Sequence, residues 1–197
     1  SGFEFGFCAD FQRCKWSDRG ILHSDKFTPG RAVFKNAKFE NDADFSGSFF
    51  GEDADFSESE FSGSVSFTPT IFGRGASFIK AEFRGSADFT GSRFGWKANF
   101  SNTKFSFVIF GLVSWNGYVN FTGASFHVAN FKGSVFKASA VFDFVHFLSH
   151  TDFSGVPQAS WEHQINALEK DLEVQFRLID FHKSSDAELN LKSDQFG

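Results

Sequence analysis

The sequence predicts an all-β solenoid, a parallel β-helix, followed by a helical tail. Phe accounts for 33 of the 197 residues, and it returns at steps that largely alternate between five and six residues. A small residue, most often Ala or Ser, stands two positions before most of these large residues, and Asp or Asn often stands directly before them. Ser or Thr and then Gly frequently follow, which is typical of a turn.

This spacing excludes an ordinary helix and a long flat strand. Steps of five or six residues drift around a helical surface, and a long strand would need strict alternation. A short extended segment followed by a turn fits the pattern. In such a segment the large residue and the small residue two positions before it both point inward, while the residue between them faces solvent. The pattern runs from Phe5 to Phe153, so we predict the solenoid over residues 3–155.

The regular Phe positions predict ladders of rings inside the solenoid. Consecutive coils should stack at the strand spacing of roughly 4.8 Å, which places each Phe on the Phe of the next coil. Small residues two positions earlier would leave the room that these rings need. The Phe residues that should test this inward register are Phe45, Phe56, Phe67, Phe78, Phe89 and Phe100.

Three segments carry the repeat most clearly: Ala-Asp-Phe-Ser-Gly at 43–47, Ala-Asp-Phe-Thr-Gly at 87–91 and Ala-Asn-Phe-Ser-Asn at 98–102. They resemble the pentapeptide repeats, written A-[D/N]-[L/F]-X-X. The resemblance implies a right-handed quadrilateral parallel β-helix with four short faces per coil. Because every second unit has six residues, we expect a coil of about 22 residues, and a flatter two-faced coil of 11 is the alternative.

The spacing of large residues changes after Pro157. Steps of three and four predict an amphipathic helix over 157–182, and a capping box at 185–188 predicts a second helix over about 186–196. We assign 156–197 to a C-terminal helical tail that either caps the last coil or forms a homodimer through these helices. The apolar residues of the first helix are Trp161, Ile165, Leu168, Leu172, Phe176 and Ile179.

Two stretches are candidate protein interfaces. Residues 38–61 carry eight acids against one Lys, whereas 62–142 carry eight bases against two acids. Residues 105–118 place apolar side chains at outward positions, and contiguous exposed apolar surface usually marks an interface. A tail that folds back over this apolar stretch is the alternative. The candidate interface residues are Asp44, Glu52, Asp53, Asp55, Glu58 and Glu60 in the acidic stretch, and Phe107, Ile109, Leu112 and Tyr118 in the apolar one.

The sequence carries no pattern that points to an enzyme. It has no Gly-rich phosphate loop between a strand and a helix, no nucleophile elbow and no acid/base pair with a reason to be tuned. His146 and His150 are four residues apart in the solenoid, where that spacing does not juxtapose them as metal ligands. We predict a non-catalytic protein-binding or scaffold module with a protein partner, no cofactor or metal, and no specific nucleic-acid or small-molecule ligand.

Two other functions stay open. The resemblance implies a DNA-mimicking inhibitor or protector of a type II topoisomerase, although the bases of 62–142 argue against one. The chain begins with Ser1 and not with Met, so we also expect a trimmed piece, such as the cytosolic domain of a larger membrane or signalling protein. Membrane attachment would then come only from regions outside this chain. Two Cys are too few for a disulfide framework, which favours the cytoplasm.

Overall fold

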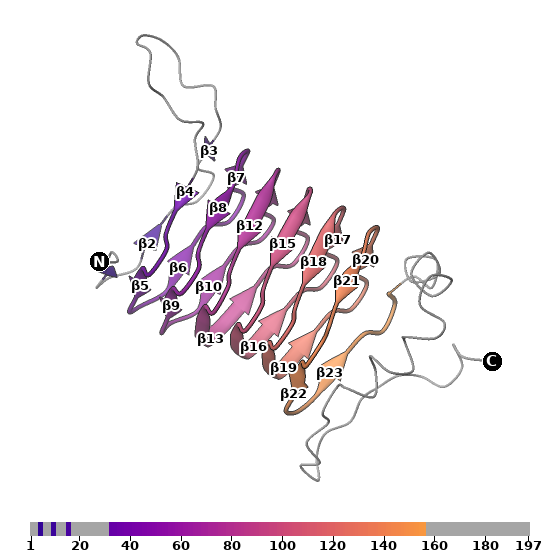
Figure 1. Cartoon of the computed structure of the whole chain (residues 1–197). Helices are drawn as coiled ribbons and strands as arrows, with labels where there is room; N and C mark the ends of the chain where they lie inside the picture. The colour runs from indigo at the N-terminus through magenta and orange to yellow at the C-terminus, as the bar shows by residue number, and fades with distance from the viewer. Residues whose placement is uncertain (1–3, 6–8, 11–14, 17–31, 157–197) are drawn as a thin grey trace, which may run out of the picture.

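The computed structural model describes residues 4–5, 9–10, 15–16 and 32–156. Within them the chain forms short parallel strands in coils that stack along one axis (Figure 1). In this described part no helix is long and apolar enough to cross a membrane. The tail helices predicted over 157–182 and 186–196 lie outside the described residues, and so do their apolar side chains.

Four rows of strands run along the axis, and we number them as faces 1 to 4 in the order in which the chain visits them. Face 1 contains β1 (Glu4–Phe5), β5 (Lys38–Phe39), β9 (Glu60–Phe61) and β22 (His146–Phe147). Face 2 contains β2 (Ala9–Asp10), β6 (Ala43–Asp44), β10 (Val65–Ser66) and β23 (Thr151–Asp152). Three longer strands run through both faces: β13 (Glu82–Asp88), β16 (Lys104–Ile109) and β19 (Ser125–Asn130).

The other two rows are separate six-stranded sheets. Face 3 contains β3 (Lys15–Trp16), β7 (Phe49–Phe50), β11 (Ile71–Phe72), β14 (Arg93–Phe94), β17 (Ser114–Trp115) and β20 (Val135–Phe136). Face 4 contains β4 (Ala32–Val33), β8 (Ala54–Asp55), β12 (Gly75–Ser77), β15 (Lys97–Asn99), β18 (Tyr118–Asn120) and β21 (Ala140–Val141). The four rows confirm a four-sided coil and leave no place for the two-faced alternative.

The coil changes length along the rod. Phe61 pairs with Phe83 and Phe83 with Phe105, so these coils hold the predicted 22 residues. Phe105 pairs with Phe126 and Phe126 with Phe147, which gives 21 residues per coil. The residue is lost at the corner between faces 1 and 2, where the register of β13 against β16 shifts after Phe83. The expectation of 22 residues is therefore wrong for the later coils.

The inward register of the Phe ladders is confirmed. Phe67 stacks on Phe89 with ring centroids 4.8 Å apart, and Phe78 stacks on Phe100 at the same distance. Rings of adjacent ladders meet edge to face, as Phe78 and Phe89 do at 5.6 Å and 90°. Burial of each ring contributes about 1.5–3 kcal/mol, and aromatic contacts add about 0.5–1.5 kcal/mol. The test residues, all 0% exposed, are Phe45, Phe56, Phe67, Phe78, Phe89 and Phe100.

The small residues two positions before the rings are also buried. Ala43, Ala54 and Ala87 fill this position without a polar group. Where Ser or Thr stands there, its hydroxyl donates to a backbone carbonyl of the neighbouring coil, as Thr103 Oγ1 does to the oxygen of Phe78 at 2.7 Å. A buried hydroxyl with a partner avoids the cost of an unsatisfied group. The position therefore selects for small volume and accepts either Ala or a hydroxyl.

The Asp or Asn directly before a ring closes the turn that follows. Its side-chain oxygen accepts a hydrogen bond from the N–H two residues later, the geometry that makes Asp and Asn common in turns. Asp88 Oδ1 accepts from Thr90 at 2.8 Å, and Asn99 Oδ1 accepts from Ser101 at 3.0 Å. This shared contact explains why the repeat alternates between Asp and Asn at this site.

Replacing Asp88 with alanine should therefore destabilise the rod by about 1 kcal/mol, because the N–H of Thr90 loses its partner. Asp88→Asn is the matched control and should leave stability nearly unchanged, since Asn99 makes the same contact. Urea denaturation followed by circular dichroism measures both. An equal loss in the two variants would show that the charge of Asp88 matters and not its hydrogen bond.

The corner between faces 3 and 4 is built from glycines, and we call it the glycine corner: Gly73, Gly75, Gly95 and Gly117. A Cβ at Gly95 would lie 2.0 Å from the backbone oxygen of Gly73, and one at Gly117 would lie 1.7 Å from that of Trp96. Real Cβ atoms do not approach backbone atoms so closely. Glycine is required here because neighbouring coils touch backbone to backbone.

Candidate protein-interaction site

The predicted acidic interface is a ring and not a patch. Its 24 residues, 38–61, exceed one 22-residue coil, so they pass every face of the rod. Asp44 lies on face 2, Asp55 on face 4 and Glu60 on face 1. Glu52 and Asp53 lie between faces 3 and 4, and Glu58 lies in the turn between faces 4 and 1. The structure therefore distributes these carboxylates around the axis.

Several of these carboxylates already have partners within the rod. Asp44 Oδ1 accepts from the N–H of Ser46 at 2.8 Å, and Asp55 Oδ1 accepts from that of Ser57 at 3.0 Å. Asp55 is also buried. Both residues thus have the structural role of the repeat, and their charge is less available to a partner protein.

The three glutamates form ion pairs across coils. Glu52 contacts Arg74 at 3.0 Å, and Glu58 contacts Lys35 at 3.6 Å. Such exposed pairs contribute little stability, typically about 0–1 kcal/mol each. They do lower the net charge that the acidic ring presents.

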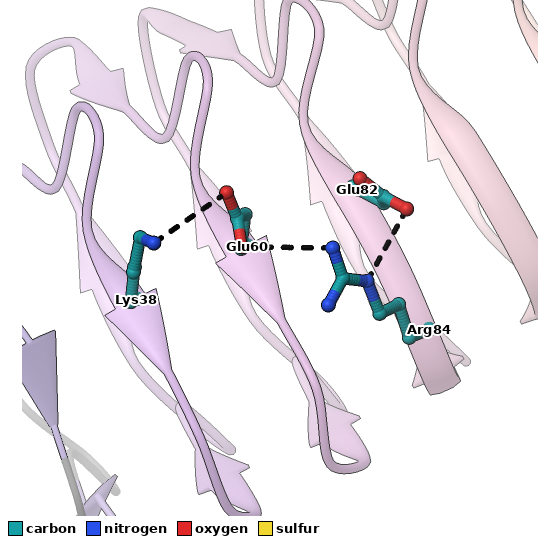
Figure 2. Close-up of polar contacts among 4 residues, drawn as sticks. All are labelled: Lys38, Glu60, Glu82 and Arg84. Carbon is teal, nitrogen blue, oxygen red and sulfur yellow. Dashed lines mark hydrogen bonds and ion pairs between the residues drawn. The ribbon is translucent and has the colours of Figure 1, made fainter.

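Glu60 belongs to a four-membered network on faces 1 and 2 (Figure 2). Its carboxylate lies 3.9 Å from Lys38 Nζ and 3.7 Å from Arg84 Nη2, and Arg84 Nε donates to Glu82 at 3.2 Å. The hydrogen bond to Glu82 and the negative charges of Glu82 and Glu60 raise the pKa of Arg84. Arg84 therefore stays charged and balances the two glutamates beside it.

An apolar surface lies on face 2 and its adjoining corner, and we call it the Phe107 surface: Phe107, Ile109, Leu112 and Val128. Phe107 and Val128 are direct neighbours in the register of β16 and β19. Ile109 points outward from the same strand as Phe107 and is half-buried. Phe107 and Leu112 are the exposed members, at 40% and 65%. The structure thus brings together three of the four residues predicted for the apolar interface.

Tyr118 is the residue that the structure separates from this surface. It lies on β18 of face 4, in register with Lys97 of β15, whereas Phe107 lies in the sheet of faces 1 and 2. The stretch 105–118 spans more than half a coil, so its two ends face different directions. The predicted continuous surface from Phe107 to Tyr118 is therefore divided.

Leu112 combines an exposed apolar side chain with a left-handed backbone. Its φ is +55°, a conformation that costs a residue with a Cβ roughly 1–2 kcal/mol. The same turn holds Gly91 in the preceding coil and Gly133 in the following one, both with positive φ. Neither burial nor backbone geometry favours leucine at this position. A residue that violates both local rules marks a functional site.

Trp96 is an exposed residue that the sequence-based prediction missed. It is 67% exposed, and the guanidinium of Arg74 lies 5.9 Å from the centroid of its ring. It stands two positions after the inward Phe94, an offset where other units carry Gly, Ser or Asn. That offset is an outward corner in the predicted register, so the signal was present.

Groups capable of metal or acid/base chemistry are dispersed. Among residues 32–156 and the short strands before them, no group of three or more His, Cys, Asp or Glu could hold a metal ion. Burial favours a higher pKa for Asp152, but hydrogen bonds from Ser154 and the charges of Lys132 and His150 hold its pKa below the ordinary value. Asp152 occupies the turn position shared by Asp44 and Asp88, so its shifted pKa has a structural explanation.

Comparisons with known proteins identify the repeat. Residues 29–71 match a family model described as pentapeptide repeats, in nine copies. No curated protein matches the chain. A solved structure that is similar is the trypsin-treated form of QnrB1, a plasmid-mediated fluoroquinolone resistance protein, at 14% identity and a TM-score of 0.22. The comparison covers 84% of this chain and 98% of that one, but a likeness at this score carries no argument about function.

Proposed function

Since this chain is a pentapeptide-repeat protein, we propose that it is a non-catalytic module that binds a protein partner through the Phe107 surface. The observation that carries the proposal is Leu112, an apolar side chain that is 65% exposed on a strained backbone. Phe107 lies on the strand that leads into this turn. Two exposed apolar side chains beside half-buried Ile109 and Val128 offer a partner the apolar centre that interfaces commonly have.

The rod supplies rigidity to this surface. Phe105 and Val108 alternate inward along the strand that carries Phe107, and both are buried. Backbone hydrogen bonds tie the turn to the next coil, including the one from the N–H of Leu112 to the oxygen of Lys132 at 2.9 Å. A surface held in this way loses little conformational entropy on binding, which favours affinity.

Mimicry of DNA is the alternative that the charge pattern does not favour. It requires negative charge along the rod, because a duplex carries one charge per about 1.7 Å of its axis. Here the acids encircle one coil, and the coils that follow carry Arg74, Lys80, Arg93 and Lys97. A groove built for DNA and aligned with the rod would meet these bases. We therefore favour the protein-binding module over a topoisomerase inhibitor.

Leu112→Gly is expected to remove partner binding without unfolding the rod. Glycine accepts the positive φ of this turn but adds entropy to the unfolded chain, so the free energy of unfolding should change by less than about 1 kcal/mol. Recovery of the partner should fall at least about tenfold, since truncation of an apolar anchor at an interface centre typically has this effect. Affinity purification with quantitative mass spectrometry measures the recovery.

Phe144→Gly is the matched control for that experiment. Phe144 also has a positive φ, of 54°, and is 60% exposed, but it lies in the turn between faces 4 and 1. It should retain every partner that the unmodified chain retains. If Leu112→Gly recovers the same partners in the same amounts as the unmodified chain, the Phe107 surface is not the binding site.

A further inference from the structure

The glycine corner carries a charge gradient along the rod axis. Glu52 and Asp53 occupy it in one coil, Arg74 and Gly75 in the next, and Trp96 and Lys97 in the one after. Gly75 pairs with Lys97, and the pairing of Ala54 with Ala76 places Asp53 directly beside Gly75 on the other side. Along this single corner the charge therefore changes from negative to positive over three stacked coils.

The groups at the two ends of this gradient are available for a partner. Asp53 and Lys97 are both exposed, and neither forms an ion pair with another described residue. Arg74 at the centre is held by Glu52 on one side and lies over the ring of Trp96 on the other. Trp96, at 67% exposed, is therefore a large apolar group on a prearranged surface with unpaired charge beside it.

We propose that this corner is a self-association surface, on which two copies of the chain pack side by side and antiparallel. A two-fold axis perpendicular to the rod at the level of Gly75 would bring Asp53 of each copy opposite Lys97 of the other. The same rotation would bring Trp96 opposite Glu52, whose carboxylate can accept a hydrogen bond from the indole N–H. Closed two-fold dimers need a surface that is complementary to itself, and a gradient from acid to base meets that need when it is reversed.

The glycines make such an approach possible. Gly75 lies at the proposed axis and has no side chain, while Gly73 and Gly95 leave the backbone of face 3 uncovered beside it. Two coils separate Asp53 from Lys97, which places the two intermolecular ion pairs about 10 Å apart at the usual strand spacing. A second copy fits this corner better than an acidic peptide or a nucleic acid, since either of those would meet Glu52 and Asp53 beside the bases.

The proposal predicts association that depends on charge, and sedimentation velocity of the purified full chain tests it over a range of concentrations. Dimerisation should weaken when salt rises from about 50 mM to about 500 mM, because exposed ion pairs are screened. Asp53→Lys and Lys97→Asp should each weaken the dimer by about tenfold or more, since each variant places like charges opposite each other twice. Trp96→Ala should weaken it as well.

Mixing the two charge variants provides the decisive arm. In a one-to-one mixture, the D53K chain opposite the K97D chain restores two attractive pairs, so a heterodimer should form although neither variant associates alone. Circular dichroism of each variant checks that the rod is folded, as exposed positions should allow. A chain that stays monomeric at about 1 mM in low salt, a dimer that survives both substitutions, or a mixture that stays monomeric would each overturn the proposal. None of these results depends on the Phe107 surface.

Discussion

Phe89→Ala is expected to lower the free energy of unfolding by about 3–5 kcal/mol, the usual cost of emptying a buried Phe site. Phe89 is 0% exposed and stacks between Phe67 and Phe110, with centroids 4.8 Å and 5.0 Å away. It also meets Phe78 and Phe100 edge to face. The cavity cannot close easily, because these rings belong to strands whose spacing is fixed by backbone hydrogen bonds. Chemical denaturation measures the loss.

Phe107→Ala is the control for that measurement. This ring is 40% exposed on the outer side of the rod, so its removal should cost much less than removal of Phe89. A near-zero effect of Phe89→Ala would contradict a packed ladder. Equal costs at the two sites would show that inward and outward Phe contribute alike, which the geometry does not allow.

Gly95→Ala is expected to destabilise the rod by about 1–3 kcal/mol, the range seen when atoms are forced into a filled site. The added Cβ would lie 2.0 Å from the carbonyl oxygen of Gly73. That carbonyl cannot retreat freely, because the N–H of Gly95 donates to the oxygen of the adjacent Phe72 at 2.7 Å. The two coils would have to separate at this corner. Thermal and urea unfolding of the variant both report the change.

Gly111→Ala separates close approach from a general effect of glycine. A Cβ at Gly111 would have its nearest contact at 3.6 Å, with Ile109 Cγ2, which is an ordinary distance. Stability should stay within about 0.5 kcal/mol, as for most substitutions without a clash. If both variants lose the same stability, the backbone contact at Gly95 is not the cause.

The sequence predicted the core well because one physical rule governs it. In an extended segment the side chains alternate, so a ring such as Phe56 and the small Ala54 two residues earlier must share the inner side. Any other register would expose the rings to water. The shorter later coils could also have been predicted, since Phe100, Phe105, Phe110 and Trp115 are separated by steps of five.

The candidate surfaces were harder to predict, because neighbours in sequence and neighbours in space are different sets in this fold. Consecutive residues encircle the axis, so the acids from Asp44 to Glu60 form a ring. Residues that meet on one side are a whole coil apart, as are Arg74 and Trp96. Linear clustering of charge therefore predicted a patch that the fold distributes. Grouping the chain by coil length would have found the Arg74–Trp96 contact.

The residue lost between Phe83 and Phe107 has a consequence for how this rod can change in evolution and in engineering. One fewer residue at the corner of faces 1 and 2 leaves the ladders continuous, since Phe105 still stacks on Phe83 and Phe110 on Phe89. Length differences are thus absorbed locally and are not transmitted to the next coil. This corner is consequently a natural insertion point, where a loop or a whole domain could be grafted while the coils on either side keep their alignment.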